Sequence, residues 1–224
     1  MIAALIQQEF IHHPTAAYTK LQHGGFTIYV SPDAKKNPIS TDPALKMMRE
    51  AITQFSKLVP KSSLITLRKA PIWVEHLNPG VTSCCFHESV DWLRENGFNT
   101  DKAKAVEVGS PINYVNWTKL NQPFQLFHEF AHAYHSIRLG FEDPTVKAAY
   151  QAAVDSKKYE AVKYNLGGNK RAYALNNQME YFAELSEAYF GVNDFYPFTR
   201  AELKSFDPKG YAMIEWAWKL PAPK

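Results

Sequence analysis

The sequence contains very little cysteine. Only two cysteines occur among its 224 residues, and these two, Cys84 and Cys85, are adjacent in the chain. A disulfide between chain neighbours is geometrically awkward, and two cysteines are too few for a disulfide framework. A small disulfide-rich fold is therefore excluded. We expect both residues to be free, buried thiols, and the sequence leaves their redox state open.

The sequence also lacks an excess of charge of one sign. Its 25 Lys and Arg residues against 22 Asp and Glu residues give a formal net charge of +3, and no run of basic residues is longer than two. This balance does not produce the strongly positive surface that nucleic acid requires. We therefore expect no nucleic-acid partner.

Long hydrophobic runs are absent as well. No segment approaches the ~20 consecutive apolar residues of a membrane-spanning helix. The apolar run at residues 2–6 is too short for the core of a signal peptide and has no basic flanks. We expect no membrane span and no signal peptide in the chain as given, and hence a cytoplasmic location by default. Secretion after removal of a leader stays open, as does the oligomeric state.

Strand patterns dominate the first half of the chain, whose overall composition, with 46% hydrophobic residues, is that of a globular protein. The pattern predicts strands at residues 25–30, 63–68, 72–76, 82–87 and 103–108. It predicts a short helix over residues 89–96 and a longer one that begins with Asp42 as its N-cap and Pro43 at its first position. The longer helix ends at Pro60.

Helical patterns take over from Pro123 onward, and the sequence predicts helix starts at Asp143, Thr199 and Asp207. Strands that come early and helices that come late indicate an α+β protein. We expect a single domain over residues 1–224. Residues 1–140 form a mixed sheet lobe together with the helix that begins at Pro123 and ends at Gly140, and residues 141–224 form a helical lobe.

One motif in the helix after Pro123 has the spacing of a metal site. His128, Glu129 and His132 form the pattern His-Glu-x-x-His. Residues four apart lie one above the other on a helix, so the two imidazoles face a common point and the carboxylate projects beside them. Two neutral nitrogen donors and a carboxylate that can act on water are the components of a catalytic zinc site.

A third ligand has to come from another part of the chain. His135 lies seven residues beyond His128, about 10 Å along a helix, so we assign it to packing or to support of a ligand. The better source is the acidic stripe formed by Glu180, Glu184 and Glu187 on one face of a helix. Metal-bound histidines commonly donate their other N–H to a carboxylate, and we expect Glu184 to accept it.

Together these segments resemble the zincin metallopeptidase domain of the anthrax toxin lethal factor and Pro-Pro endopeptidase family. In that family a second helix of the form Glu-aromatic-Phe-Ala-Glu follows the first motif, and here Glu180 begins such a segment 48 positions after His132. The family also has a tyrosine seven residues before its ligand glutamate, where this sequence has Tyr173. The likeness covers residues 122–190.

The resemblance implies a role for each matching residue. It implies that His128, His132 and Glu180 bind one zinc ion per chain, that Glu129 is the general base and that Tyr173 stabilises the oxyanion. It also implies a zincin-like fold, with a zinc cleft between the sheet lobe and the helical lobe. Zincins bind substrate along a sheet edge, for which residues 105–108 are our candidate.

We therefore predict a zinc-dependent metallopeptidase that acts on a peptide or protein. Two alternatives remain open at this point. A zinc-dependent hydrolase or lyase that acts on a small molecule would use the same motif, because motifs identify a site better than a substrate. A non-enzymatic, zinc-stabilised binding module would not need Glu129 and would normally hold its metal with four protein ligands. The sequence does not indicate a cleavage-site preference.

Overall fold

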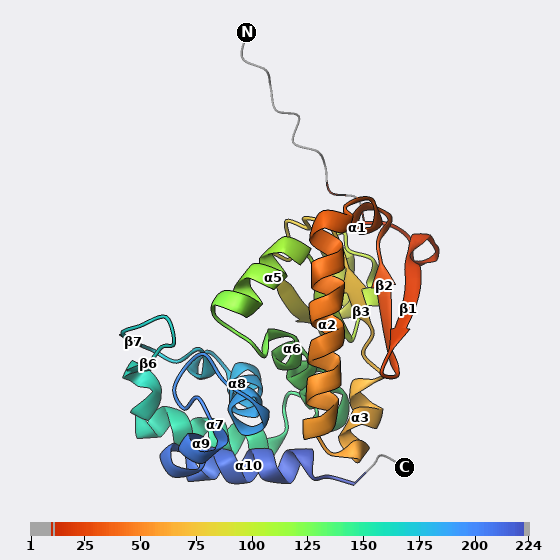
Figure 1. The fold of residues 1–224 in the computed structure, drawn as a ribbon. Helices are drawn as coiled ribbons and strands as arrows, with labels where there is room; N and C mark the ends of the chain where they lie inside the picture. The colour runs from red at the N-terminus through yellow and green to blue at the C-terminus, as the bar shows by residue number, and fades with distance from the viewer. Residues whose placement is uncertain (1–9, 11, 222–224) are drawn as a thin grey trace.

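Five strands form one mixed sheet in the N-terminal half of the chain (Figure 1). A computed structural model describes residues 10 and 12–221, so the apolar run at residues 2–6 lies outside the described residues. The strands lie side by side in the order β1-β2-β3-β5-β4. Their bounds are Thr19–His23 (β1), Phe26–Val30 (β2), Ile72–Val74 (β3), Cys84–His87 (β4) and Ala105–Val108 (β5).

The sheet has a parallel centre and two antiparallel edges. β2, β3 and β5 run parallel, while β1 pairs with β2 and β4 pairs with β5 in the antiparallel sense. Our expectation that residues 105–108 form an edge is wrong, because Cys84 pairs with Val108 and His87 with Ala105 along β5. All four residues of β5 are buried, as in a central strand. The free edge on this side is β4.

The two cysteines begin this edge strand. Both are free, as expected, but they are partly exposed rather than fully buried. Burial nevertheless raises the pKa of the Cys84 thiol and that of the Cys85 thiol. Both side chains therefore remain protonated, weakly nucleophilic thiols at neutral pH.

The first half contains more helices than the two that the sequence predicts, which are the helix from Asp42 to Pro60 and the short helix over residues 89–96. The bounds of the observed helices are Pro32–Lys36 (α1), Pro38–Leu58 (α2), Lys61–Leu67 (α3), Val90–Glu95 (α4) and Pro111–Leu120 (α5). α2 begins at Pro38 rather than Pro43. Because proline has no N–H group, Pro43 cannot donate the helical hydrogen bond to the carbonyl oxygen of Ile39. This loss is tolerated because Ile39 is 95% exposed, so water can donate a hydrogen bond to that oxygen instead.

The segment predicted as a strand at residues 63–68 is the helix α3. Leu64 and Leu67 recur at helical spacing and are both buried, and α3 packs against the helix α6 defined below. The Ser63 hydroxyl donates a hydrogen bond of 2.9 Å to the carbonyl oxygen of Trp218, far along the chain. Tertiary packing therefore overrides the local strand preference of this segment.

The second half is almost wholly helical. Its helices are Gln125–Tyr134 (α6), Pro144–Ser156 (α7), Gln178–Phe190 (α8), Arg200–Phe206 (α9) and Pro208–Trp218 (α10), with a small hairpin of Val162–Lys163 (β6) and Asn169–Lys170 (β7). The predicted caps are confirmed: Asp143 and Asp207 accept hydrogen bonds from the first turns of α7 and α10, and Thr199 forms a capping box with Glu202. Among the described residues, no helix has the length and apolar character to cross a membrane.

α6 joins the two halves of the fold (Figure 1). It packs against β4 and β5 on one side and against α8 on the other. Phe130 of α6 lies 5.1 Å from Phe26 of β2, and Phe127 lies 5.6 Å from Trp218 of α10, measured between ring centroids. Every residue of α6 is buried, and a π-helical turn over His135–Leu139 extends it to Gly140. The helix that carries the motif is therefore held rigidly, in an α+β fold as predicted.

Candidate metal centre

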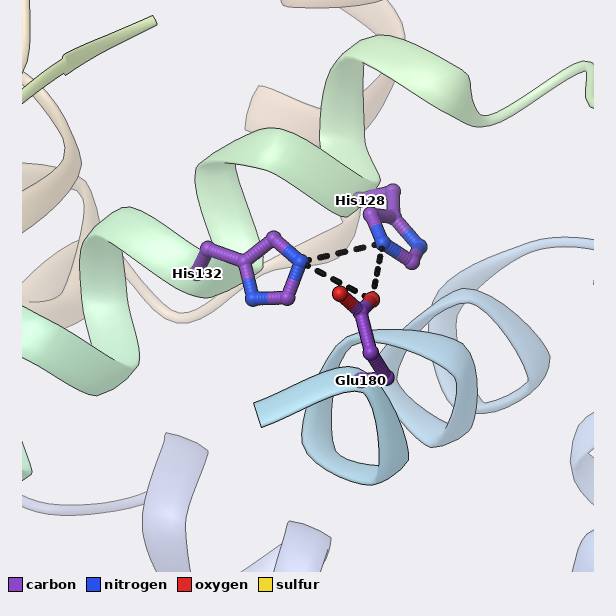
Figure 2. Close-up of side chains that lie close together, drawn as sticks. All are labelled: His128, His132 and Glu180. Carbon is purple, nitrogen blue, oxygen red and sulfur yellow. Dashed lines mark hydrogen bonds and ion pairs between the residues drawn. The ribbon is translucent and has the colours of Figure 1, made fainter. Parts of the chain in front are cut away.

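Three of the predicted metal ligands converge on one point between α6 and α8 (Figure 2). The Nε2 atoms of His128 and His132 lie 3.1 Å apart. Oε2 of Glu180 lies 3.1 Å from Nε2 of His128 and 3.2 Å from Nε2 of His132. The three donor atoms thus form a nearly equilateral triangle, drawn as dashed lines in Figure 2.

Local structure fixes each of the three donors. His128 and His132 are one helical turn apart on α6, and both are buried. Glu180 lies in the first turn of α8, where the Asn177 side chain accepts hydrogen bonds from the backbone N–H groups of Met179 and Glu180. This cap starts α8 at the position that turns Glu180 toward the two histidines.

The donor set fits a zinc ion. Zinc sites use imidazole nitrogen and carboxylate oxygen at about 2.0–2.2 Å, so the donors of a tetrahedral site lie about 3.3 Å from one another. The triangle of His128, His132 and Glu180 has nearly these dimensions. Three protein donors leave one tetrahedral position for water or substrate, which is the arrangement of a catalytic site rather than a structural one.

The other nitrogen of His128 is held by a carboxylate, but not by the predicted one. Nδ1 of His128 donates a hydrogen bond of 2.7 Å to Oε1 of Glu187, which also accepts one of 2.8 Å from Gln122. Oε1 of Glu184 is 4.0 Å from the same Nδ1, outside hydrogen-bond range. The imidazole lies along the acidic stripe of α8 so that its two nitrogens face Glu180 and Glu187. Glu187 therefore orients His128, and the expectation for Glu184 is wrong.

His135 lies apart from this cluster, as its spacing predicted. It is completely buried, and neither of its ring nitrogens has a hydrogen-bond partner among the described residues. Its ring packs against Phe182 at 4.7 Å and against Phe141 at 5.0 Å. Burial lowers the pKa of His135 to about 4, so the ring is neutral at physiological pH. His135 is a packing residue.

Glu129 and Tyr173 both line the cavity that adjoins the candidate ligand His128. Glu129 is 9% exposed, and burial raises the pKa of its carboxyl group. Tyr173 begins a short 3-10 turn, Tyr173–Leu175, and is 45% exposed, with its ring centroid 6.4 Å from that of His128. Burial raises the pKa of Tyr173, so its hydroxyl remains a neutral hydrogen-bond donor.

Electrostatics at the centre favour a bound cation. Burial penalises charge on Glu180, yet its hydrogen bonds with His128 and His132 lower its pKa overall. Burial also raises the pKa of Glu184, and it raises that of Asp194 to about 7, with further contributions from neighbouring carboxylates. Several carboxylates in one buried place repel each other unless a cation or protons compensate them.

The cavity has a volume of about 380 Å³. Residues from both halves of the chain line it: Cys84, Trp117, Gln122, Gln125, His128, Glu129, Tyr164, Tyr173, Glu184, Asp194 and Phe195. Sequence reasoning missed Gln122, which contacts Glu187, and Asp194, which lies in the loop after α8. Gln122 directly precedes Pro123, the predicted start of the motif helix, which in the structure begins at Gln125, and this position was the available signal. Asp194 belongs to no periodic pattern, so nothing local could have identified it.

Comparison with known proteins gives one solved structure. No family model matches this sequence, and no curated protein matches it. Among solved structures, the chain is similar to the Pro-Pro endopeptidase PPEP-2 from Paenibacillus alvei, with 17% identity and a TM-score of 0.44. The match covers 76% of this chain and 89% of that chain.

Proposed function

We propose that this protein is a zinc-dependent metallopeptidase that cleaves peptide bonds. One observation carries the proposal: Nε2 of His128, Nε2 of His132 and Oε2 of Glu180 converge within 3.2 Å of one another, beside a cavity that Glu129 also lines. A structural metal site would have no use for a buried carboxylate that is free of the metal and next to open space. This combination favours an enzyme over a zinc-stabilised binding module.

The donor triangle of His128, His132 and Glu180 would hold the zinc ion. A zinc ion there supplies Lewis acidity, which makes water easier to deprotonate and stabilises negative charge on a carbonyl oxygen. The hydrogen bond from His128 to Glu187 keeps the proton on Nδ1 and leaves the Nε2 lone pair free to bind metal.

Two side chains that line the cavity transfer the proton and stabilise the oxyanion. Glu129 accepts a proton from the attacking water and returns it to the nitrogen of the leaving amine. Burial raises the pKa of Glu129 toward neutral pH. A pKa nearer to the working pH suits a group that first accepts a proton and then donates it. The Tyr173 hydroxyl donates a hydrogen bond to the carbonyl oxygen of the scissile bond as negative charge develops there.

The substrate peptide would lie along β4. This strand is the free edge of the sheet on the side of α6, and its first residue, Cys84, lines the metal cavity. An extended peptide that pairs with β4 satisfies the unpaired backbone groups of the edge and passes the metal ligands. β4 thus replaces residues 105–108 in our hypothesis for the substrate-binding edge.

Digestion of a peptide library by the zinc-loaded protein, followed by sequencing of the products, tests this proposal. We expect defined cleavage by the wild type and none by Glu129→Gln, because the amide cannot accept a proton. Asp155→Asn, a carboxylate-to-amide change at an exposed residue of α7, is the matched control and should cleave like the wild type. If the zinc-loaded wild type cleaves no peptide, a hydrolase or lyase of small molecules becomes the better interpretation.

A further inference from the structure

A groove beside α5 adjoins the metal cavity, and we call it the α5 groove. It has a volume of about 440 Å³. Its lining residues are all uncharged: Thr82, Ser83, Asn113, Asn116, Trp117 and Leu120. Trp117 also lines the metal cavity, so the two spaces share one wall. A ligand that fills the metal cavity therefore meets the α5 groove at Trp117.

Two of the exposed side chains in the α5 groove are large and apolar. Trp117 is 40% exposed and Leu120 is 64% exposed, although α5 already packs Tyr114 and Val115 into the core. Single exposed apolar side chains are ordinary, but a group of them with a polar rim marks a binding site. The rim here is polar and uncharged, so the groove suits an apolar ligand.

The indole ring of Trp117 is held in place although it is partly exposed. Its Nε1 donates a hydrogen bond of 3.3 Å to Oε1 of Gln122, and Nε2 of Gln122 donates one of 2.8 Å to Oε1 of Glu187. Glu187 in turn accepts the hydrogen bond from His128. A wall that is ordered before the ligand arrives loses less conformational entropy on binding than a mobile surface side chain. Trp117 is therefore a preformed apolar surface that is linked to a metal ligand.

The α5 groove also continues the proposed path of the substrate. Thr82 and Ser83, which line the groove, directly precede Cys84, which begins β4 and lines the metal cavity. Nε2 of Gln125, another residue of the metal cavity, donates a hydrogen bond of 2.8 Å to Oγ of Ser83. An extended peptide advances about 3.3 Å per residue, so one that lies along β4 and continues past Cys84 reaches the groove within about two residues.

We propose that the α5 groove binds a large apolar side chain of the substrate, about two residues or fewer from the scissile bond. This inference rests on the proposed peptidase function and adds a substrate class, namely peptides with leucine, isoleucine or phenylalanine near the cleaved bond. Trp117 and Leu120 bury part of that side chain. A charged side chain finds no partner among the lining residues and loses hydration there, so the groove selects against it.

Matched peptides test the inference on the wild-type, zinc-loaded protein. The products of the library digestion are aligned on the cleaved bond, and the position enriched in large apolar residues is varied. Asparagine has nearly the shape of leucine but carries a polar amide, so two peptides that differ only by this exchange isolate the apolar contact. We expect kcat/KM to be about 10-fold higher for the leucine peptide, the effect of partly burying one such side chain.

Binding without turnover provides a second measurement. The groove contacts a side chain that does not react, so its contribution is made in the ground state as well as in the transition state. The Kd values of the two peptides for the inactive Glu129→Gln protein, measured by calorimetry, should therefore differ by the same ratio.

Two variants of α5 assign the preference to the groove. Leu120→Asn removes one of the two apolar walls and should lower the leucine-to-asparagine ratio about threefold, half of the effect in free energy. Ile112→Asn makes the same exchange on the same helix but outside the groove, and should leave the ratio unchanged. Ile112 is 50% exposed, so both variants should keep the thermal stability of the wild type.

The failures of the two proposals are distinguishable. Equal kcat/KM for the leucine and asparagine peptides, or a preference that Leu120→Asn leaves at its wild-type value, would overturn the inference and leave the peptidase function in place. No cleavage of any peptide would overturn both. The other candidate occupant of the groove is a second copy of the chain, which analytical ultracentrifugation detects. A wild-type dimer that Leu120→Asn dissociates without a change in peptide preference would assign the groove to self-association and contradict the inference.

Discussion

Nδ1 of His128 and Oε1 of Glu187 form a hydrogen bond of 2.7 Å that links the motif helix α6 to α8. Removal of such a partner typically weakens metal binding by about 10- to 100-fold, because the imidazole loses its orientation and part of its basicity. We predict this loss of zinc affinity for Glu187→Gln, measured by competition with a chelator. Glu160→Gln changes an exposed glutamate outside the site and should bind zinc like the wild type. Equal zinc affinities of the two variants would show that Glu187 does not support metal binding.

The ligand assignment predicts that His132→Ala loses the metal. One of three protein donors disappears, and the remaining His128 and Glu180 cannot hold zinc tightly. Elemental analysis of the purified variant should give far less than one equivalent of zinc. His23→Ala, which alters a histidine of β1 far from the site along the sheet, should retain one equivalent. Full occupancy of the His132 variant would refute the assignment.

Tyr173→Phe isolates the hydroxyl that we place at the oxyanion. The loss of one such donor costs about 10² to 10³ in kcat, while KM should change little because the hydrogen bond strengthens mainly in the transition state. Zinc content and thermal stability should match the wild type, since Tyr173 is 45% exposed. Tyr29 stacks on Trp73 in the sheet. The variant Tyr29→Phe therefore controls for the general effect of removing a tyrosine hydroxyl. A wild-type kcat for the Tyr173 variant would make this residue a packing residue.

Removal of zinc should lower the stability of the whole chain. The ligands come from α6 and from α8, so a bound ion cross-links two helices that are far apart in the sequence. Ligand binding to the native state stabilises it by about 2.7 kcal/mol at a free concentration 100 times Kd. We expect a chelator to lower Tm by several degrees and added zinc to restore it, as measured by calorimetry. The His132→Ala variant should show no such response.

We predict that Lys102 contributes to stability rather than to activity. Its side chain is completely buried, and its Nζ lies 2.7 Å from Glu75 and 3.0 Å from Glu107. Lys102→Met leaves two buried carboxylates without their cation, which should cost about 3–5 kcal/mol of unfolding free energy in denaturant titrations. Lys46→Met, at an exposed position of α2, should cost less than about 0.5 kcal/mol. Similar values for both variants would contradict a stabilising role for the buried cluster.

The sequence predicts the parts of this protein that local spacing determines. The i, i+4 pair His128 and His132, the caps at Asp143 and Asp207 and the α+β order of elements follow from helical periodicity and capping chemistry, and the structure has them at those residues. The roles of Glu129, Tyr173 and Glu180 stay predictions. These roles concern metal binding and the chemical reaction, which the experiments above measure.

The errors arise where distant contacts decide the outcome. The segment over residues 61–67 has strand-forming residues, yet packing on α6 makes it helical. The choice between Glu184 and Glu187 depends on how α8 crosses α6, to within a fraction of a helical turn. The edge position of β4 depends on an antiparallel return of the chain after β3. No short window of sequence contains any of these relationships.

The unpaired edge of β4 also bears on self-association. A strand edge that accepts a peptide accepts the edge of another copy of the chain by the same hydrogen bonds, which is a common route to aggregation. β4 spans only four residues, Cys84–His87, so a neighbouring chain gains few hydrogen bonds by pairing with it. The shortness of this strand thus limits aggregation, while its four residues are enough backbone for the single extended segment that the proposed function places beside His128.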